Sequence, residues 1–115
     1  MSDFALVILA EMRLNAAKAL EHAARGGQGW NQDDLVVDAV ANRVRQVTEL
    51  AKYQFPEDEK AAYAQIPWDE LARARDFYTH HYADLDKERL RETVEGPVRS
   101  LLEELERLDL PALGE

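Results

Sequence analysis

The sequence predicts an all-α fold, an antiparallel bundle of four to five helices that forms one domain over residues 1–115. Apolar residues recur at intervals of three and four along most of the chain, which is the spacing of one helix face. Short segments rich in glycine, proline or acidic residues separate these stretches. Amphipathic helices joined by short links bury their apolar faces against one another, so consecutive helices are expected to run antiparallel.

The first expected helix begins at Ser2, whose hydroxyl can cap it, and ends at Gly26-Gly27. A loop over residues 26–31 follows, and we expect Asn31 to cap the second helix ahead of two aspartates. Despite its valines, the second stretch is expected to be helical because its apolar stripe spans four turns. The apolar faces are Phe4, Leu6, Leu9, Met12, Ala16, Leu20 and Ala23 in the first helix, and Val36, Val40, Val44, Val47 and Ala51 in the second.

A connector over residues 53–66 is expected next, interrupted by Pro56 and by an acidic run. One helical turn is expected within it, around residues 61–64. The third helix should start at Pro67, a residue that suits the first helical position, and should run to about His81.

After a turn over residues 83–86, we expect Asp86 to cap a fourth helix. Gly96-Pro97 interrupts it, because proline removes a backbone donor and crowds the preceding turn. The apolar face continues beyond this point, so we expect a kink and not a stop, with Pro111 and Gly114 ending the structure. That face comprises Leu90, Val94, Val98, Leu101, Leu105 and Leu108.

The composition narrows the classes of function. The absence of cysteine excludes disulfides, thiolate metal sites and cysteine nucleophiles. A net charge of −9 disfavours a large surface for duplex DNA, although residues 67–91 are nearly balanced, with 5 basic and 6 acidic side chains. We expect no signal peptide and no membrane association, because the apolar run of residues 4–10 is too short to cross a bilayer, and we expect a cytoplasmic location.

Two common kinds of site can be set aside. Residues 26–29 lack the lysine and the hydroxyl residue of a phosphate-binding loop. Alanine, phenylalanine and tyrosine stand three positions before His22, His80 and His81, so the Glu-x-x-His pairs of a carboxylate-bridged metal bundle are missing. We therefore expect neither a metal nor a cofactor.

The segment Arg75–Tyr82 is the candidate for chemistry, because it combines an arginine with two histidines. Arginine offers a fixed fork of donors for a phosphate, and histidine titrates near neutral pH and can move protons. Two such groups suffice for cleavage of RNA without metal: a base removes the proton from the ribose 2′-hydroxyl, the oxygen attacks phosphorus, and a cation stabilises the charge. Asp76 could hold the arginine or a histidine in place. The alternative is purely structural, with Phe77 and Tyr78 in the core and Arg75 paired with Glu70 or Asp84.

The spacing of this segment has a geometric consequence. In an ideal helix, five residues place His80 about 140° around the axis from Arg75. One protomer would have difficulty aiming both side chains at one phosphate. Either the helix ends before His80, or two protomers of a homodimer each supply one group to a shared site.

The segment Ile66-Pro67-Trp68, followed by Arg-x4-His-x-Tyr over residues 75–82, resembles the HepT-like branch of the HEPN family, and the resemblance extends over nearly the whole chain. It implies a small helical bundle that acts as the toxin of a toxin–antitoxin pair, a metal-independent ribonuclease that cleaves RNA. The usual partner is a minimal nucleotidyltransferase antitoxin, which in some pairs silences the toxin by transferring AMP to the motif tyrosine. Carried over, Arg75 and His80 would be catalytic and Tyr82 would be the modified residue.

The chain departs from the family pattern at several positions. Asp76 stands where many members have asparagine, and it adds negative charge near the substrate while still offering a polar support. His81 also satisfies the broader family spacing, so either histidine could be the catalytic one. Residues 83–86 keep only an apolar residue and an aspartate of the Phe-Gly-Val-Asp that follows in many members. The rival interpretation is a non-catalytic HEPN bundle that binds a partner or a nucleotide.

Overall fold

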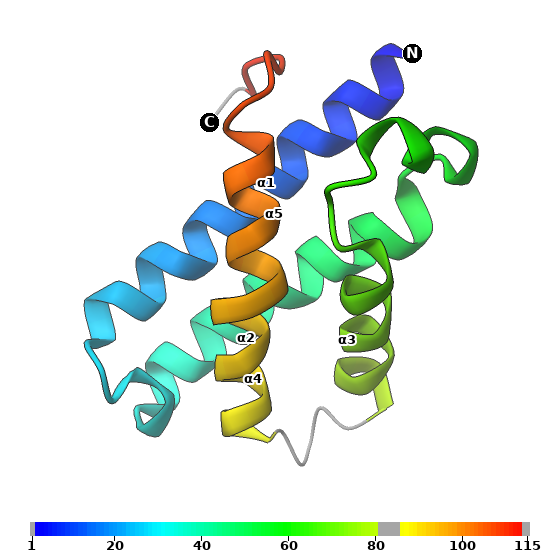
Figure 1. The fold of residues 1–115 in the computed structure, drawn as a ribbon. Coiled ribbons are helices and arrows are strands. Elements are labelled where there is room, and N and C mark those ends of the chain that lie inside the picture. The colour runs from blue at the N-terminus through cyan, green and yellow to red at the C-terminus, as the bar shows by residue number, and fades with distance from the viewer. Residues whose placement is uncertain (1, 81–85, 114–115) are drawn as a thin grey trace.

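The computed structural model describes residues 2–80 and 86–113, with the backbone alone for residues 77–80, and every regular element in those ranges is helical (Figure 1). The predicted all-α bundle is therefore confirmed. The elements follow in the order α1 (Asp3–Gly26), η1 (Trp30–Gln32), α2 (Asp34–Glu49), η2 (Leu50–Gln54), η3 (Glu57–Tyr63), α3 (Trp68–His80), α4 (Lys87–Thr93), η5 (Val94–Val98) and α5 (Arg99–Leu105).

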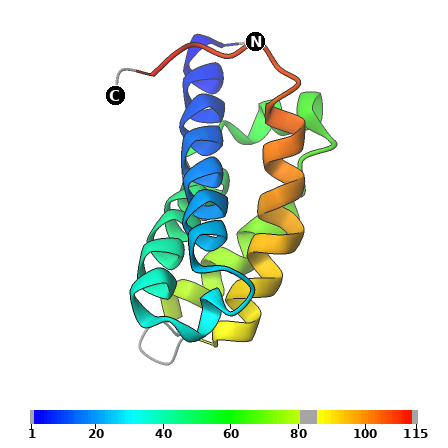
Figure 2. The same cartoon turned by 90° about the vertical axis from the view of Figure 1, so that its left-hand side faces the viewer.

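Helices α1 and α2 form an antiparallel hairpin along one side of the bundle (Figures 1 and 2). As expected, Ser2 caps α1, and its hydroxyl accepts a hydrogen bond of 3.1 Å from the amide of Ala5. The link to η1 needs glycine twice. Gly27 has a φ of 74°, and a Cβ on Gly26 would lie 2.6 Å from Cβ of Trp30.

The prediction that Asn31 caps α2 is wrong, because the cap lies two residues later. Asp33 caps this helix, its carboxylate accepting from the amides of Leu35 at 3.1 Å and Val36 at 3.5 Å. Asn31 lies in the short 3-10 helix η1 and is buried, with its amide directed to the start of α4. A tertiary contact therefore engages the residue that the sequence pattern assigned to a cap.

The connector after α2 is shorter than expected. The chain continues as a π-helical turn, η2, to Gln54, and η3 covers residues 57–63 where one turn near residues 61–64 was expected. Phe55 follows η2 directly and is buried. Its ring is stacked on that of Trp68, at 4.8 Å between centroids, and is edge-on to that of Tyr63, at 5.9 Å. These aromatic contacts join the connector to the first turn of α3.

The last helical rod runs through α4, η5 and α5 without a stop, as the continuous apolar face predicted. The interruption at Gly96-Pro97 takes the form of a π-helical turn, whose wider hydrogen-bonding pattern accommodates a residue without an amide donor. The buried face on both sides of it comprises Leu90, Val94, Val98, Leu101 and Leu105.

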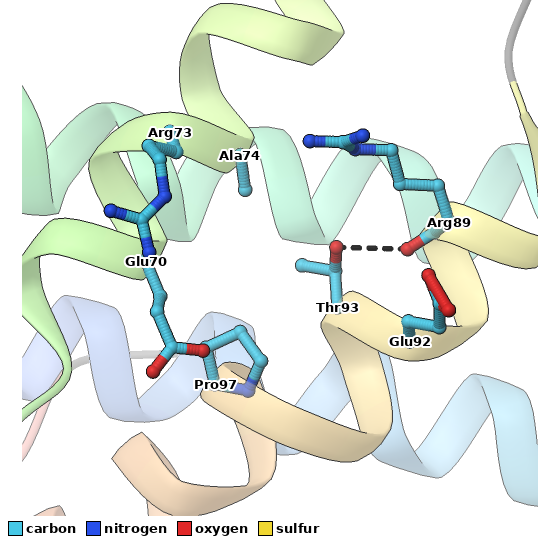
Figure 3. A pocket seen from close by; sticks show the side chains of 7 residues that line it. All are labelled: Glu70, Arg73, Ala74, Arg89, Glu92, Thr93 and Pro97. Carbon is cyan, nitrogen blue, oxygen red and sulfur yellow. Dashed lines mark hydrogen bonds between the residues drawn. The ribbon is translucent and has the colours of Figure 1, made fainter.

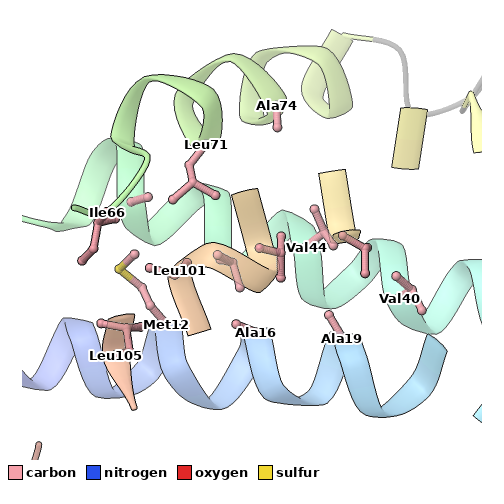
Figure 4. Close-up of a cluster of buried hydrophobic side chains, with 14 of the residues drawn as sticks. Met12, Ala16, Ala19, Val40, Val44, Ile66, Leu71, Ala74, Leu101 and Leu105 are labelled. Carbon is pink, nitrogen blue, oxygen red and sulfur yellow. The ribbon is translucent and has the colours of Figure 1, made fainter. Parts of the chain in front are cut away.

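The core lies where this rod and α3 cross the α1–α2 hairpin (Figure 4). Small residues on α1, including Ala16 and Ala19, are fully buried and let α2 approach closely. Phe4, expected on the buried face, is instead 55% exposed, because Ala5 and Ile8 occupy that face. Within the described ranges, no helix combines the length and the apolarity needed to cross a membrane.

Candidate active site

Helix α3 carries the candidate segment, and its first turns are firmly anchored. Leu71 is fully buried and Ala74 nearly so, which fixes one face of the helix against the core. The indole of Trp68 donates a hydrogen bond of 3.1 Å to the carbonyl of Tyr63. The position of Arg75, one residue after Ala74, is thereby set by packing against α2 and η2.

Arg75 forms an ion pair with Glu49, the last residue of α2. The guanidinium donates through Nε to the carboxylate, and its Cζ lies 5.1 Å from the centre of the Tyr53 ring. A guanidinium at this distance from an aromatic ring is attracted to its negative face. The arginine side chain is only 17% exposed, so these contacts hold its orientation.

Asp76 pairs with Lys52, on the π-helical turn η2. The hydrogen bond from the ammonium to Asp76 raises the pKa of Lys52 above its usual value. The same ammonium lies 5.3 Å from the centre of the Tyr53 ring. Two cations, each with a carboxylate partner, therefore lie close to one aromatic ring beside the motif.

Of the predicted site residues, the structure describes the side chains of Arg75 and Asp76. Arg75 pairs with Glu49, whereas the structural alternative had placed it against Glu70 or Asp84. Asp84, the other partner considered, lies outside the described residues, as do His81 and Tyr82, and the side chains of Phe77, Tyr78 and His80 are not described.

The backbone of α3 remains helical through His80. The helix does not end before this residue, so positions 75 and 80 lie about 140° apart around its axis. Of the two arrangements considered, this excludes the one in which the helix ends before His80.

Glu49, Lys52 and Tyr53 are the site residues that the sequence interpretation missed. Its apolar stripe for the second helix ended at Ala51, and it placed a connector from residue 53. The usable signal was the helical spacing itself, because residues 49, 52 and 53 are three and four positions apart and share one helix face.

The opposite flank of α3 borders a pocket of about 310 Å³ between α3 and the rod of α4 and η5 (Figure 3). Arg73 and Arg89 line it from the two helices, together with Glu70, Ala74, Glu92, Thr93 and Pro97. In Figure 3 the guanidinium of Arg89 extends toward Ala74 on α3. Two arginines and two glutamates give this lining no net formal charge.

Among the side chains that the structure describes, those of residues 2–76 and 86–113, no group of three or more histidine, aspartate or glutamate residues could hold a metal ion. The polar groups that the site does present are a guanidinium, an ammonium, two carboxylates and a phenol. Such a set can bind phosphate oxygens and an aromatic base.

The fold and this site define the class of the protein: an all-α bundle that carries an Arg-x4-His segment on its third helix. The chain belongs to the HepT-like ribonuclease family, since the family model described as ribonuclease HepT-like matches residues 12–108. The matched range contains Glu49, Lys52, Tyr53, Arg75 and Asp76, and the family's name assigns ribonuclease activity to the family as a whole. No curated protein and no solved structure matches the chain.

Proposed function

We propose that this protein is a metal-independent endoribonuclease that acts as the toxin of a toxin–antitoxin pair, with Arg75 and His80 as its catalytic residues. Membership of the HepT-like ribonuclease family supports the activity. The observation that carries the assignment of the site is the placement of Arg75, held on α3 by Glu49 and Tyr53 within the Arg-x4-His segment. Asp76 and His81 support these residues.

The reaction uses the ribose 2′-hydroxyl as its nucleophile. The imidazole of His80 removes the proton, the 2′-oxygen bonds to the adjacent phosphorus, and the bond from phosphorus to the 5′-oxygen breaks. Arg75 stabilises the negative charge that develops on the phosphoryl oxygens. The leaving 5′-oxygen takes up a proton, so the products are a 2′,3′-cyclic phosphate and a 5′-hydroxyl.

The test is cleavage of an end-labelled single-stranded RNA by purified protein, together with growth arrest on expression. Arg75→Ala and His80→Ala should each abolish both, while circular dichroism and melting stay close to wild type. Arg99→Ala is the matched control, because Arg99 is an exposed arginine on α5 paired with Glu95. It should leave cleavage unchanged.

Three outcomes would revise the proposal. If His81→Ala is inactive and His80→Ala is active, His81 is the base. If EDTA stops cleavage and added magnesium restores it, the metal-independent mechanism is wrong. If wild-type protein neither cleaves RNA nor arrests growth, the non-catalytic alternative replaces the nuclease.

We further propose that a minimal nucleotidyltransferase antitoxin regulates the toxin by transferring AMP to Tyr82. In a helical continuation of α3, residues 75 and 82 would share a face, since seven residues make about two turns. A phosphate added there would occupy Arg75 and repel RNA. Incubation with the partner and ATP should raise the intact mass by one or more AMP units. No increase in wild type, or an equal increase in Tyr82→Phe, would contradict this.

A further inference from the structure

Tyr53 is an exposed aromatic residue at the edge of the candidate site. It lies on the π-helical turn η2 and remains 56% exposed, although the Arg75 guanidinium and the Lys52 ammonium both lie near its ring. π-Helical turns are rare and occur often at functional sites, because they redirect side chains out of the regular helical register. Here the turn presents a ring to solvent directly beside the motif arginine.

The two cations hold this ring in a defined place. The centroid of the Tyr53 ring lies 5.1 Å from Cζ of Arg75 and 5.3 Å from Nζ of Lys52. Both cations are themselves fixed, since Arg75 pairs with Glu49 and Lys52 with Asp76. The ring is therefore oriented before any ligand arrives, which lowers the entropy lost on binding.

The chemistry around the ring matches a nucleobase and its phosphate. Proteins recognise unpaired bases of single-stranded RNA by stacking them on aromatic side chains, next to cations that contact the backbone. The carboxylates of Glu49 and Asp76 neutralise much of the local positive charge, so a phosphate alone has little net attraction to this surface. Stacking on an exposed ring adds affinity that does not depend on charge.

We propose that Tyr53 is a base-stacking subsite for single-stranded RNA, which seats one nucleobase on its ring while Arg75 contacts the neighbouring phosphate. The inference rests on the proposed ribonuclease function and adds a substrate-positioning residue outside the Arg-x4-His segment. It commits the site to an unpaired base, because a base within a duplex is stacked on its neighbours and cannot reach the ring.

Binding and cleavage can be measured separately. A fluorescein-labelled 2′-O-methyl RNA of twelve nucleotides lacks the nucleophilic hydroxyl, so its anisotropy reports binding without cleavage. Tyr53→Leu should weaken this binding by about 5- to 150-fold, the range found when one stacking residue is removed, and should raise KM far more than it lowers kcat on cleavable RNA. Tyr53→Phe and Tyr53→Trp should bind nearly as well as wild type, because they keep an aromatic face.

A base-free probe separates stacking from an indirect effect on Arg75. One abasic nucleotide is placed at each position of the oligonucleotide in turn. At the position that contacts Tyr53, wild type should lose affinity, and Tyr53→Leu should bind the abasic and the intact probe equally. If Tyr53→Leu weakens every abasic probe as much as the intact one, the ring serves only to place Arg75 and the subsite is wrong.

The control is Phe4→Leu, because Phe4 is 55% exposed and lies at the start of α1, outside the candidate site. It should bind and cleave as wild type does.

If wild type cleaves RNA and Tyr53→Leu has unchanged Kd and KM, the subsite is wrong and the nuclease stands. If Tyr53→Leu weakens binding but no variant cleaves RNA, the subsite stands and the nuclease is wrong. If Tyr53→Leu alters only the sedimentation of the protein, the ring is an interface between two copies and the subsite is wrong.

Discussion

Asp76 places a negative charge one residue from the arginine that is to bind phosphate, and Lys52 pairs with it. We predict that Lys52 supports RNA binding by neutralising Asp76. Lys52→Met should raise KM by about two- to fivefold, the range expected for losing one partly exposed ion pair. In cleavage assays Asp76→Asn in the same chain should restore KM, and Lys52→Arg should behave as wild type. If the double variant is as poor as Lys52→Met, the ammonium acts directly on the RNA.

The Lys52–Asp76 pair also sets an expectation for pH dependence. The pKa of Lys52 is raised above its usual value of 10.5 by Asp76, so the stabilisation from this group is complete below about pH 10.5 and is lost as pH rises through the raised pKa. Lys52 therefore keeps its positive charge from pH 5 to 9. A cleavage-rate profile in that window should report a histidine, and its inflection near neutral pH should be the same in Lys52→Met. A shifted inflection would show that Lys52 influences the catalytic base.

At the scale of single residues, the sequence pattern indicated which side chains of α3 are candidates, and it did not indicate their partners. Arg75 and Asp76 could be proposed because residue type and spacing within one segment point to phosphate chemistry. Glu49 lies 26 residues before its partner Arg75, and Lys52 lies 24 residues before its partner Asp76. Their contacts with α3 therefore exist only through tertiary packing. Period-based reasoning follows one helix at a time and does not pair residues across two helices.

At the scale of elements, one buried polar side chain joins η1 to the last helical rod. Asn31 is 1% exposed, donates to the carboxylate of Glu88 at 2.7 Å, and accepts from Nη1 of Arg91 at 2.9 Å. Removing it breaks hydrogen bonds to two charged side chains, the carboxylate of Glu88 and the guanidinium of Arg91. Asn31→Ala should lower the free energy of unfolding by about 1–3 kcal/mol, measured by urea denaturation.

A matched substitution isolates this effect. Asn42 is exposed on α2 and accepts from Arg45 at 3.1 Å, so Asn42→Ala should change stability by less than about 0.5 kcal/mol. Equal losses from Asn31→Ala and Asn42→Ala would show that the burial of Asn31 contributes nothing. The two variants also test the revised assignment of the cap. If Asn31 capped α2, its loss would weaken α2, whereas its observed contacts predict that its loss detaches α4.

Helix positions were predictable because apolar period and capping residues act locally, and α3 and the last rod begin within one residue of expectation. The π-helical turns η2 and η5 were not predictable in this way. Each adds a residue to one turn without altering the apolar spacing much, and each contacts neighbouring helices that the pattern of a single helix does not contain. The π-helical turn η2, which carries Lys52 and Tyr53, is thus an element that the sequence pattern does not predict.

At the scale of the whole molecule, we predict a two-fold dimer in which Arg75 of one chain and His80 of the other serve one phosphate. The helical backbone through His80 places the two positions about 140° apart within one chain, and a two-fold axis near α3 would pair them between chains. Residues 67–91, the least acidic stretch, would line the resulting cleft. Sedimentation of a 13.1 kDa monomer at micromolar concentration would contradict the dimer.

Mixing inactive chains tests whether the site is shared. A mixed dimer of Arg75→Ala and His80→Ala chains would hold one site with both defects and one intact site. Equal amounts, exchanged by brief partial denaturation, should therefore recover roughly a quarter of wild-type cleavage, since half the dimers are mixed and each has one working site of two. Self-contained sites would leave every combination inactive.

In the converse experiment, shared sites predict a loss of cleavage by wild-type chains and self-contained sites predict no loss. A chain that carries both Arg75→Ala and His80→Ala should poison wild-type chains if sites are shared, because both sites of a mixed dimer then lack one group. With self-contained sites the wild-type chain in each mixed dimer keeps its own site, and cleavage per wild-type chain stays constant. Titrating wild type with a threefold excess of the double variant should therefore reduce cleavage to roughly a quarter, the fraction of wild-type chains that still pair with wild type. A constant rate would overturn the shared site while leaving the dimer itself intact.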